Sequence, residues 1–118
     1  MSFFGPTNVS LYRMAAALER SEADRAAELA GPVNTDHIAS SERRAKFWLD
    51  NGRALALLRG REGDAVAAFH RSEELAALRL RSNVYARETV TGLLPRVQRD
   101  SNIGRELRGI AYRMGIPA

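Results

Sequence analysis

The chain has 118 residues, a formal net charge of +4 and no cysteine, which excludes disulfides, thiolate catalysis and cysteine-based zinc or iron–sulfur sites. Its length predicts one domain with a core large enough to fold without such crosslinks. No stretch approaches the ~20 apolar residues of a membrane span, and the N-terminus lacks a signal-peptide pattern, so we expect a cytoplasmic protein with no membrane partner.

Helix signals follow one another along the first third of the chain. Thr7 or Asn8 can cap a helix that runs to about residue 20. Ser21 is expected to cap a second helix, which ends at the helix-breaking pair Gly31-Pro32. The next segment, residues 33–39, is expected to be irregular.

The remaining helices carry similar signals. The pair Ser40-Ser41 offers a cap for a third helix, and acidic residues mark the start of a fourth at about residue 62. Ser82-Asn83 caps a fifth helix, which Pro95 is expected to kink or split. The polar turn Asp100-Ser101-Asn102 then precedes a sixth helix. Strand signals are missing, so the sequence predicts an all-α fold of about six helices.

An internal repeat relates the first two helix pairs at an offset of 40 residues. The matching positions are Arg13, Ala16, Leu18, Glu22, Asp24 and Ala27 in one copy and Arg53, Ala56, Leu58, Glu62, Asp64 and Ala67 in the other. One hairpin cannot bury its apolar face alone, so repeated hairpins stack. We therefore expect a single domain, residues 1–118, of three stacked antiparallel hairpins at about residues 8–30, 41–77 and 83–115.

The second hairpin has the features of a tetratricopeptide-like unit. Trp48 and Gly52 are spaced like the first tryptophan and glycine of a tetratricopeptide repeat, and Phe69 lies near the aromatic position of its second helix. The small glycine is expected to let the two helices approach closely. The period exceeds the 34 residues of that repeat, so we call the array tetratricopeptide-like. Trp48 and Phe69 are assigned to the core, and Gly60 is expected to end the third helix.

Three segments also carry a resemblance to a known family. They are Gly5-Pro6-Thr7-Asn8-Val9; Glu42-Arg43-Arg44-Ala45 with Phe47-Trp48-Leu49-Asp50 and Gly52-Arg53-Ala54; and residues 104–115. These segments resemble the tetratricopeptide-like C-terminal part of actinobacterial XRE-type helix-turn-helix transcriptional regulators. The resemblance implies transcription regulation, with this chain as the ligand-sensing, peptide-sensing or dimerisation module. The sequence lacks the DNA-binding domain of such regulators, so we expect either a piece of one or a short independent relative.

No set of residues has the spacing of a catalytic or metal site. His37 and His70 are the only histidines and do not form a metal-binding motif, and the glycines form no phosphate-binding loop. Glu73 and Glu74 point about 100° apart on a helix and are interpreted as surface charge. We therefore expect no enzymatic activity, no metal and no cofactor.

A stack of helical hairpins presents a concave face that accepts an extended or helical peptide. Arg13 and Arg53 coincide in the repeat and lie on the first helices of their hairpins, which usually form that face. Tyr12 and Tyr112 are candidates because each has a polar end and neither occupies a core position of the repeat. The sequence thus predicts a module that binds a peptide, a small signal molecule or a protein through these four residues.

The sequence suggests two further partners, a second copy of the chain and nucleic acid. The apolar end of a short stack predicts a homodimer. Residues 77–118 contain eight arginines against Glu88, Asp100 and Glu106, a surplus that could attract nucleic acid. The alternatives are therefore direct, weak binding of DNA through this third of the chain, or DNA binding only through a missing N-terminal domain. A freestanding protein-interaction adaptor is the remaining alternative.

Overall fold

The computed structural model describes residues 5–117, and all regular structure in that range is helical. The prediction of an all-α protein with six helices is confirmed. The helices are α1 (Pro6–Glu19), α2 (Ala23–Ala30), α3 (Ser41–Ala56), α4 (Glu62–Ser82), α5 (Val84–Leu93) and α6 (Asn102–Met114), with 3-10 turns η1 (Thr35–His37) and η2 (Leu94–Arg96).

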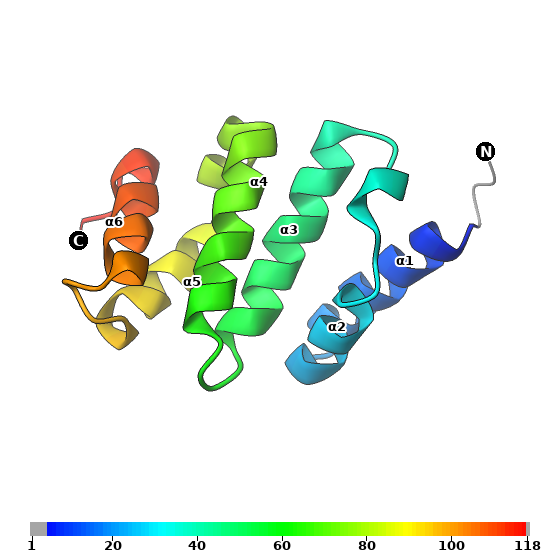
Figure 1. Ribbon diagram of the computed structural model, residues 1–118, viewed down its shortest axis with the longest axis horizontal. Helices are drawn as coiled ribbons and strands as arrows, with labels where there is room; N and C mark the ends of the chain where they lie inside the picture. Colours follow the sequence, from blue (N-terminus) through cyan, green and yellow to red (C-terminus); the bar gives the residue numbers. More distant parts are fainter. Residues whose placement is uncertain (1–4, 118) are drawn as a thin grey trace.

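The helices lie side by side along the long axis of the molecule, which measures 45 × 27 × 22 Å (Figure 1). Each helix packs against the next in the chain, and the contact between α3 and α4 is the most extensive. α1 also contacts α3, and α3 contacts α5. α1 and α6 therefore lie at opposite ends of the row, with α3 and α4 in the middle.

Three of the predicted helix starts are confirmed by side-chain caps. Ser40, Asn83 and Ser101 each accept a hydrogen bond from the backbone N–H three residues later, at 3.2, 2.9 and 2.9 Å. Gly115 is the C-cap of α6 and has a φ of 75°. The expected end of the third helix at Gly60 is wrong, because α3 ends at Ala56 with Leu57 as its C-cap, and Gly60, with a φ of 78°, lies in the turn before α4. These values favour glycine because it has no Cβ to clash with the following carbonyl.

The starts of α1 and α2 differ from the prediction. Pro6 is the first residue of α1 and Gly5 is its N-cap, so Thr7 and Asn8 lie inside the helix. Proline is favourable at this position because the first N–H of a helix has no partner in any case. Ser21 has a φ of 60° and forms part of the turn, whereas the N-cap of α2 is Glu22.

The end of α5 is as predicted, whereas α4 differs from the prediction. α5 ends at Leu93, and Pro95 falls in the 3-10 turn that follows, so the predicted split is confirmed. α4 continues through Ser82, past its expected end near residue 77, but its backbone is broken at Ala76, where φ is −156° and ψ is 75°. The short segment of residues 77–82 therefore points in a direction of its own.

The core divides into two clusters that share α3. One cluster joins α3 to α4, α5 and α6 around Phe69, and the other joins α1 and α2 to α3 around Phe47. Gly52 faces the Phe69 ring so closely that an added Cβ would lie 3.0 Å from it, which confirms the predicted close approach of α3 and α4. Trp48 is only half-buried, and its ring packs edge-on against Phe47 at 5.1 Å between centroids.

The interpretation of Glu73 as surface charge is wrong. Its side chain is buried, and its carboxylate accepts hydrogen bonds from Arg113 at 2.8 and 2.9 Å and from Arg81 at 3.2 Å. Burial alone raises the pKa of Glu73, but the hydrogen bonds and positive charges of Arg113 and Arg81 outweigh it and leave the pKa below its usual value. Glu73 therefore joins three segments: α4 before the break, α4 after the break, and α6.

The substitution Glu73→Gln is expected to lower the free energy of unfolding by about 1.5 kcal/mol at neutral pH, because a neutral amide replaces a carboxylate that accepts charged hydrogen bonds. The folded-state pKa lies below the ordinary value of 4.5. The stabilisation is therefore complete above that pH and declines as the pH falls through the folded-state pKa. In urea unfolding, the difference between wild type and variant should narrow below about pH 4.

The neighbouring exposed carboxylate supplies the control for this experiment. The Glu74 side chain is 60% exposed, so Glu74→Gln should change the free energy of unfolding by less than about 0.5 kcal/mol. A difference between wild type and Glu73→Gln that stayed constant from neutral pH down to strongly acidic pH would contradict the role assigned to this carboxylate.

Candidate functional site

A groove along α3 combines apolar and charged side chains on the surface. It consists of two adjoining cavities of about 330 and 520 Å³, which share Ala15, Lys46, Asp50 and Arg79. Ligand sites are typically about 300–1,000 Å³. We call this feature the central groove. Its lining comprises Asn8, Leu11, Tyr12, Met14, Ala15, Leu18 and Glu19 from α1; Glu42, Arg43, Lys46, Phe47, Leu49, Asp50 and Arg53 from α3; Arg79 from α4; and Asn83 and Tyr85 at the start of α5.

The floor of the groove is a charged stripe on α3. Lys46, Asp50 and Arg53 are spaced by four and three residues, so they share one face of the helix. The Lys46 Nζ donates to Asp50 Oδ2 at 2.7 Å, and Arg53 NH1 lies 3.6 Å from Asp50 Oδ1. Asp50 is only 5% exposed, so one buried carboxylate is flanked by two cations.

An aromatic contact fixes the end of the groove near α5. The guanidinium carbon of Arg53 lies 4.5 Å from the centroid of the Tyr85 ring, the geometry of a cation–π contact. The Arg53 side chain is 25% exposed, so it is partly desolvated against the ring. This contact holds the guanidinium over the groove even without a ligand.

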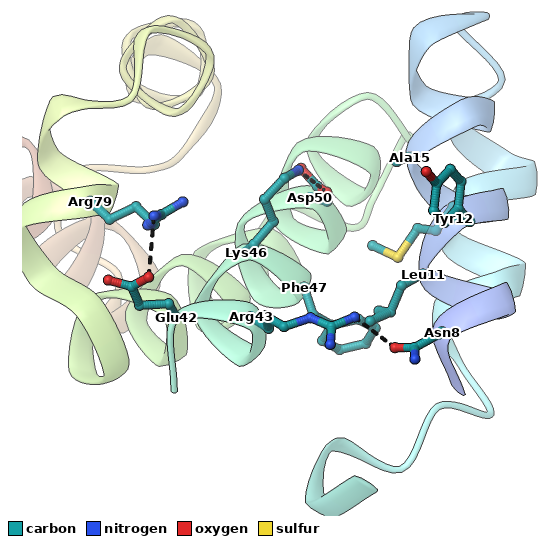
Figure 2. A pocket seen from close by; sticks show the side chains of 11 residues that line it. Asn8, Leu11, Tyr12, Ala15, Glu42, Arg43, Lys46, Phe47, Asp50 and Arg79 are labelled. Carbon is teal, nitrogen blue, oxygen red and sulfur yellow. Dashed lines mark hydrogen bonds and ion pairs between the residues drawn. The ribbon is translucent and has the colours of Figure 1, made fainter. Parts of the chain in front are cut away.

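The other end of the groove is bordered by polar contacts between helices. Figure 2 shows Arg43 of α3 donating to Asn8 Oδ1 of α1 at 2.6 Å, beside Tyr12 and Leu11. On the opposite wall, Arg79 reaches from α4 to Glu42 at 3.4 Å, and Lys46 and Asp50 lie between the two walls. Both Arg79 and Glu42 are largely exposed, so their ion pair is weak and can exchange with a ligand.

Two of the four predicted binding residues lie in the central groove. Tyr12 lines the cavity near α1, and Arg53 lines the cavity near α5. Arg13 is exposed and lines neither cavity, because it follows Tyr12 by one residue and so points about 100° away around α1. Tyr112 is 84% exposed on α6, which packs on α4 and α5 at the far end of the row.

Sequence reasoning missed the residues at the centre of the groove, namely Lys46, Asp50 and Arg79. A signal for the first two exists, because an aspartate follows Trp48-Leu49 in an otherwise buried part of the third helix. It has a cation four residues before it and another three residues after it. Arg79 could not have been found in this way, since its position depends on the break at Ala76.

Seven of the eight arginines of the last third lie on four elements and form hydrogen bonds within the chain. Arg81 on α4 and Arg113 on α6 bind Glu73. On η2, Arg96 donates to the Ala56 carbonyl and to Glu62, at 2.7 and 2.6 Å. Arg96 thereby contributes to holding the pKa of Glu62 below its usual value, after a larger effect of backbone hydrogen bonding. The positive surplus of this third is thus largely shared with nearby acceptors.

The chemistry of the central groove is that of binding. Its lining offers apolar contacts, exposed cations and tyrosine hydroxyls, the groups that hold a peptide or an organic anion. Within residues 5–117, no three histidine, aspartate or glutamate side chains lie close enough together to hold a metal ion. No helix in the same range is both long and apolar enough to cross a membrane.

Comparison with known proteins gives no relative: no protein-family model, no curated protein and no solved structure matches the chain significantly.

Proposed function

We propose that this protein is a non-enzymatic interaction module that holds a peptide segment of its partner in the central groove. The observation that carries the proposal is the groove itself, in which α1, α3 and the start of α5 bring apolar, aromatic and cationic side chains to one surface. Such mixed linings are typical of sites that bind extended or helical peptides. The resemblance to the tails of XRE-type regulators supports a role in sensing a signal for transcription.

The order of contacts supports a tetratricopeptide-like architecture for this module. In a stack of hairpins, the first helices of successive hairpins form one face and the second helices form the other. Here α1 contacts α3 and α3 contacts α5, while α4 contacts α6. The groove lies on the side of α1, α3 and α5, which is where such a stack would bind its partner. We therefore propose three stacked hairpins with the central groove as their concave face.

Tyr12→Ala is expected to weaken peptide binding about fivefold or more, because Tyr12 is an exposed aromatic contact on the wall of the groove. Peptides would first be selected on the wild-type protein from a phage-displayed library of random dodecapeptides. Their affinities would then be measured by fluorescence anisotropy. Arg53→Ala should weaken the same peptides while the circular dichroism spectrum stays unchanged.

Tyr112→Ala is the matched control. Tyr12 and Tyr112 are 80% and 84% exposed, so both substitutions remove the same side chain from equally open surfaces. The control should bind the selected peptides as wild type does. Failure to select any peptide, or equal losses in the two tyrosine variants, would show that the central groove is not the binding site.

A further inference from the structure

The two cavities of the central groove meet at a cationic junction. Apart from Ala15, the residues that line both cavities are Lys46, Asp50 and Arg79. The Lys46 and Arg79 side chains are 56% and 49% exposed, whereas the Asp50 side chain is 8% exposed. A ligand that lies across the junction therefore meets two accessible cations, while the carboxylate beside Lys46 is covered.

Two other acidic side chains line the groove, and one of them, Glu42, pairs with Arg79 of the junction at 3.4 Å. Glu42 lines only the cavity near α1, and Glu19, at the end of α1, lines only the other. Arg53 adds a third cation close to the junction, held there by Tyr85. Together the two cavities contain four cations, Arg43, Lys46, Arg53 and Arg79, against three carboxylates, of which Asp50 is covered, so the accessible charge of the lining is positive on balance.

The buried carboxylate of Asp50 positions these cations without neutralising them completely. It accepts a hydrogen bond from Lys46 at 2.7 Å and lies 3.6 Å from Arg53, so one negative charge is shared between two positive ones. Its Oδ1 atom is buried and has no hydrogen-bond donor among the described residues. Because this single carboxylate faces two cations, the floor of the groove retains an excess of positive charge.

From this charge arrangement we infer that the segment bound in the central groove is an acidic peptide, with an aspartate or glutamate side chain placed against Lys46 and Arg79. The inference rests on the function proposed above and adds the chemical class of the partner. An ionised carboxylate accepts hydrogen bonds from both cations, and it can displace the weak, exposed pair between Arg79 and Glu42. The apolar and aromatic side chains toward α1 then contact the flanking residues of the peptide.

The composition of the selected peptides tests this inference. On wild-type protein, the ratio of aspartate plus glutamate to lysine plus arginine should rise at least about threefold over the unselected library. Arg79→Glu should abolish this preference, because it reverses the charge on one wall of the junction. Binding of a selected acidic peptide should also weaken as sodium chloride is added.

Arg25→Glu is the matched control for charge reversal. Arg25 forms a pair with Glu28 at 3.4 Å, with side chains 54% and 71% exposed, and it lines neither cavity. This pair matches the pair of Arg79 and Glu42 in distance and exposure. Arg25→Glu should leave the acidic preference of the selected peptides unchanged.

Asp50→Asn supplies a gain-of-binding test that does not depend on disrupting the groove. The amide keeps the shape of the carboxylate and can still accept from Lys46, but it removes the negative charge from the junction. A selected acidic peptide should bind about threefold more tightly to this variant. Unchanged or weaker binding would overturn the inference.

The outcomes separate this inference from the function on which it rests. Peptides that depend on Tyr12 but show no acidic preference would leave the groove as the binding site and overturn only the class of partner. An acidic preference that Arg25→Glu removes as fully as Arg79→Glu would also overturn it, since the effect would then come from the net charge of the protein. A library that yields no groove-dependent peptide would overturn both proposals.

Discussion

Phe69→Ala is expected to lower the free energy of unfolding by about 3–5 kcal/mol, the cost of removing a large ring from a closed core. The Phe69 side chain is completely buried and fills the space in front of Gly52, where three of its ring carbons would lie 3.0–3.1 Å from an added Cβ. The extensive contact between α3 and α4 prevents the helices from closing the cavity. Urea unfolding followed by circular dichroism measures the loss.

A double-mutant cycle shows whether the ring and the glycine form one contact. Gly52→Ala alone should destabilise the protein by about 1 kcal/mol, because the Phe69 ring must move to admit the new methyl group. In the Phe69→Ala background, the same change should instead stabilise by about 0.5–1 kcal/mol, since alanine is the better helix former and partly fills the cavity. An equal effect in the two backgrounds would contradict the contact.

Gly104→Ala is expected to lower the free energy of unfolding by about 3 kcal/mol. The added Cβ would overlap the backbone carbonyl oxygen of Gln98 and approach that of Arg99 to 3.0 Å. Backbone atoms cannot rotate away as a side chain can, so the first turn of α6 has to move. The midpoint of thermal unfolding should fall accordingly.

Gly92→Ala is the control, because it makes the same chemical change at an exposed helix position, whereas Gly104 is buried. No atom outside its own helix lies within 4 Å of the Cβ that would be added at Gly92. This variant should be more stable than wild type by about 0.5–1 kcal/mol, because alanine loses less backbone entropy on folding. The two glycine variants should thus shift the unfolding midpoint in opposite directions, and a shared direction would contradict the packing at Gly104.

Much of the fold could be predicted because its signals are local. The caps at Ser40, Asn83 and Ser101 depend on hydrogen bonds that span three residues, and Pro95 ends α5 through its own ring. Pro6 misled the prediction because proline is compatible both with the turn before a helix and with its first position.

Two structural features could not be predicted because they depend on distant contacts. Ala76 lies in a run of strong helix formers, so nothing in the local sequence indicates that the backbone leaves the helical region there. Glu73 has the sequence context of a surface residue, and only its contact with Arg113, 40 residues away, makes it a buried one. In both cases tertiary packing overrides the local preference.

The residues of the candidate site also fall into those that the sequence could predict and those that depend on distant contacts. Arg53 could be proposed from the repeat and Tyr12 from its polar end outside the core positions of the repeat, and both line the central groove. The repeat also suggested Arg13, which matches Arg53 in sequence. The Arg13 side chain nevertheless points away from the groove on α1. Arg79 enters the groove from a segment whose orientation is set beyond the helix break, so no pattern in the sequence could have placed it there.

The break at Ala76 also has a consequence for the way in which the protein opens locally. A continuous ladder of backbone hydrogen bonds makes a helix unwind cooperatively, and a non-helical residue interrupts that coupling. Residues 77–82 can therefore fray as a separate unit, restrained by the burial of Leu80 and by the bond from Arg81 to Glu73. Because Arg79 belongs to this unit, one wall of the groove can move while the packed layer of α3 and α4 stays intact.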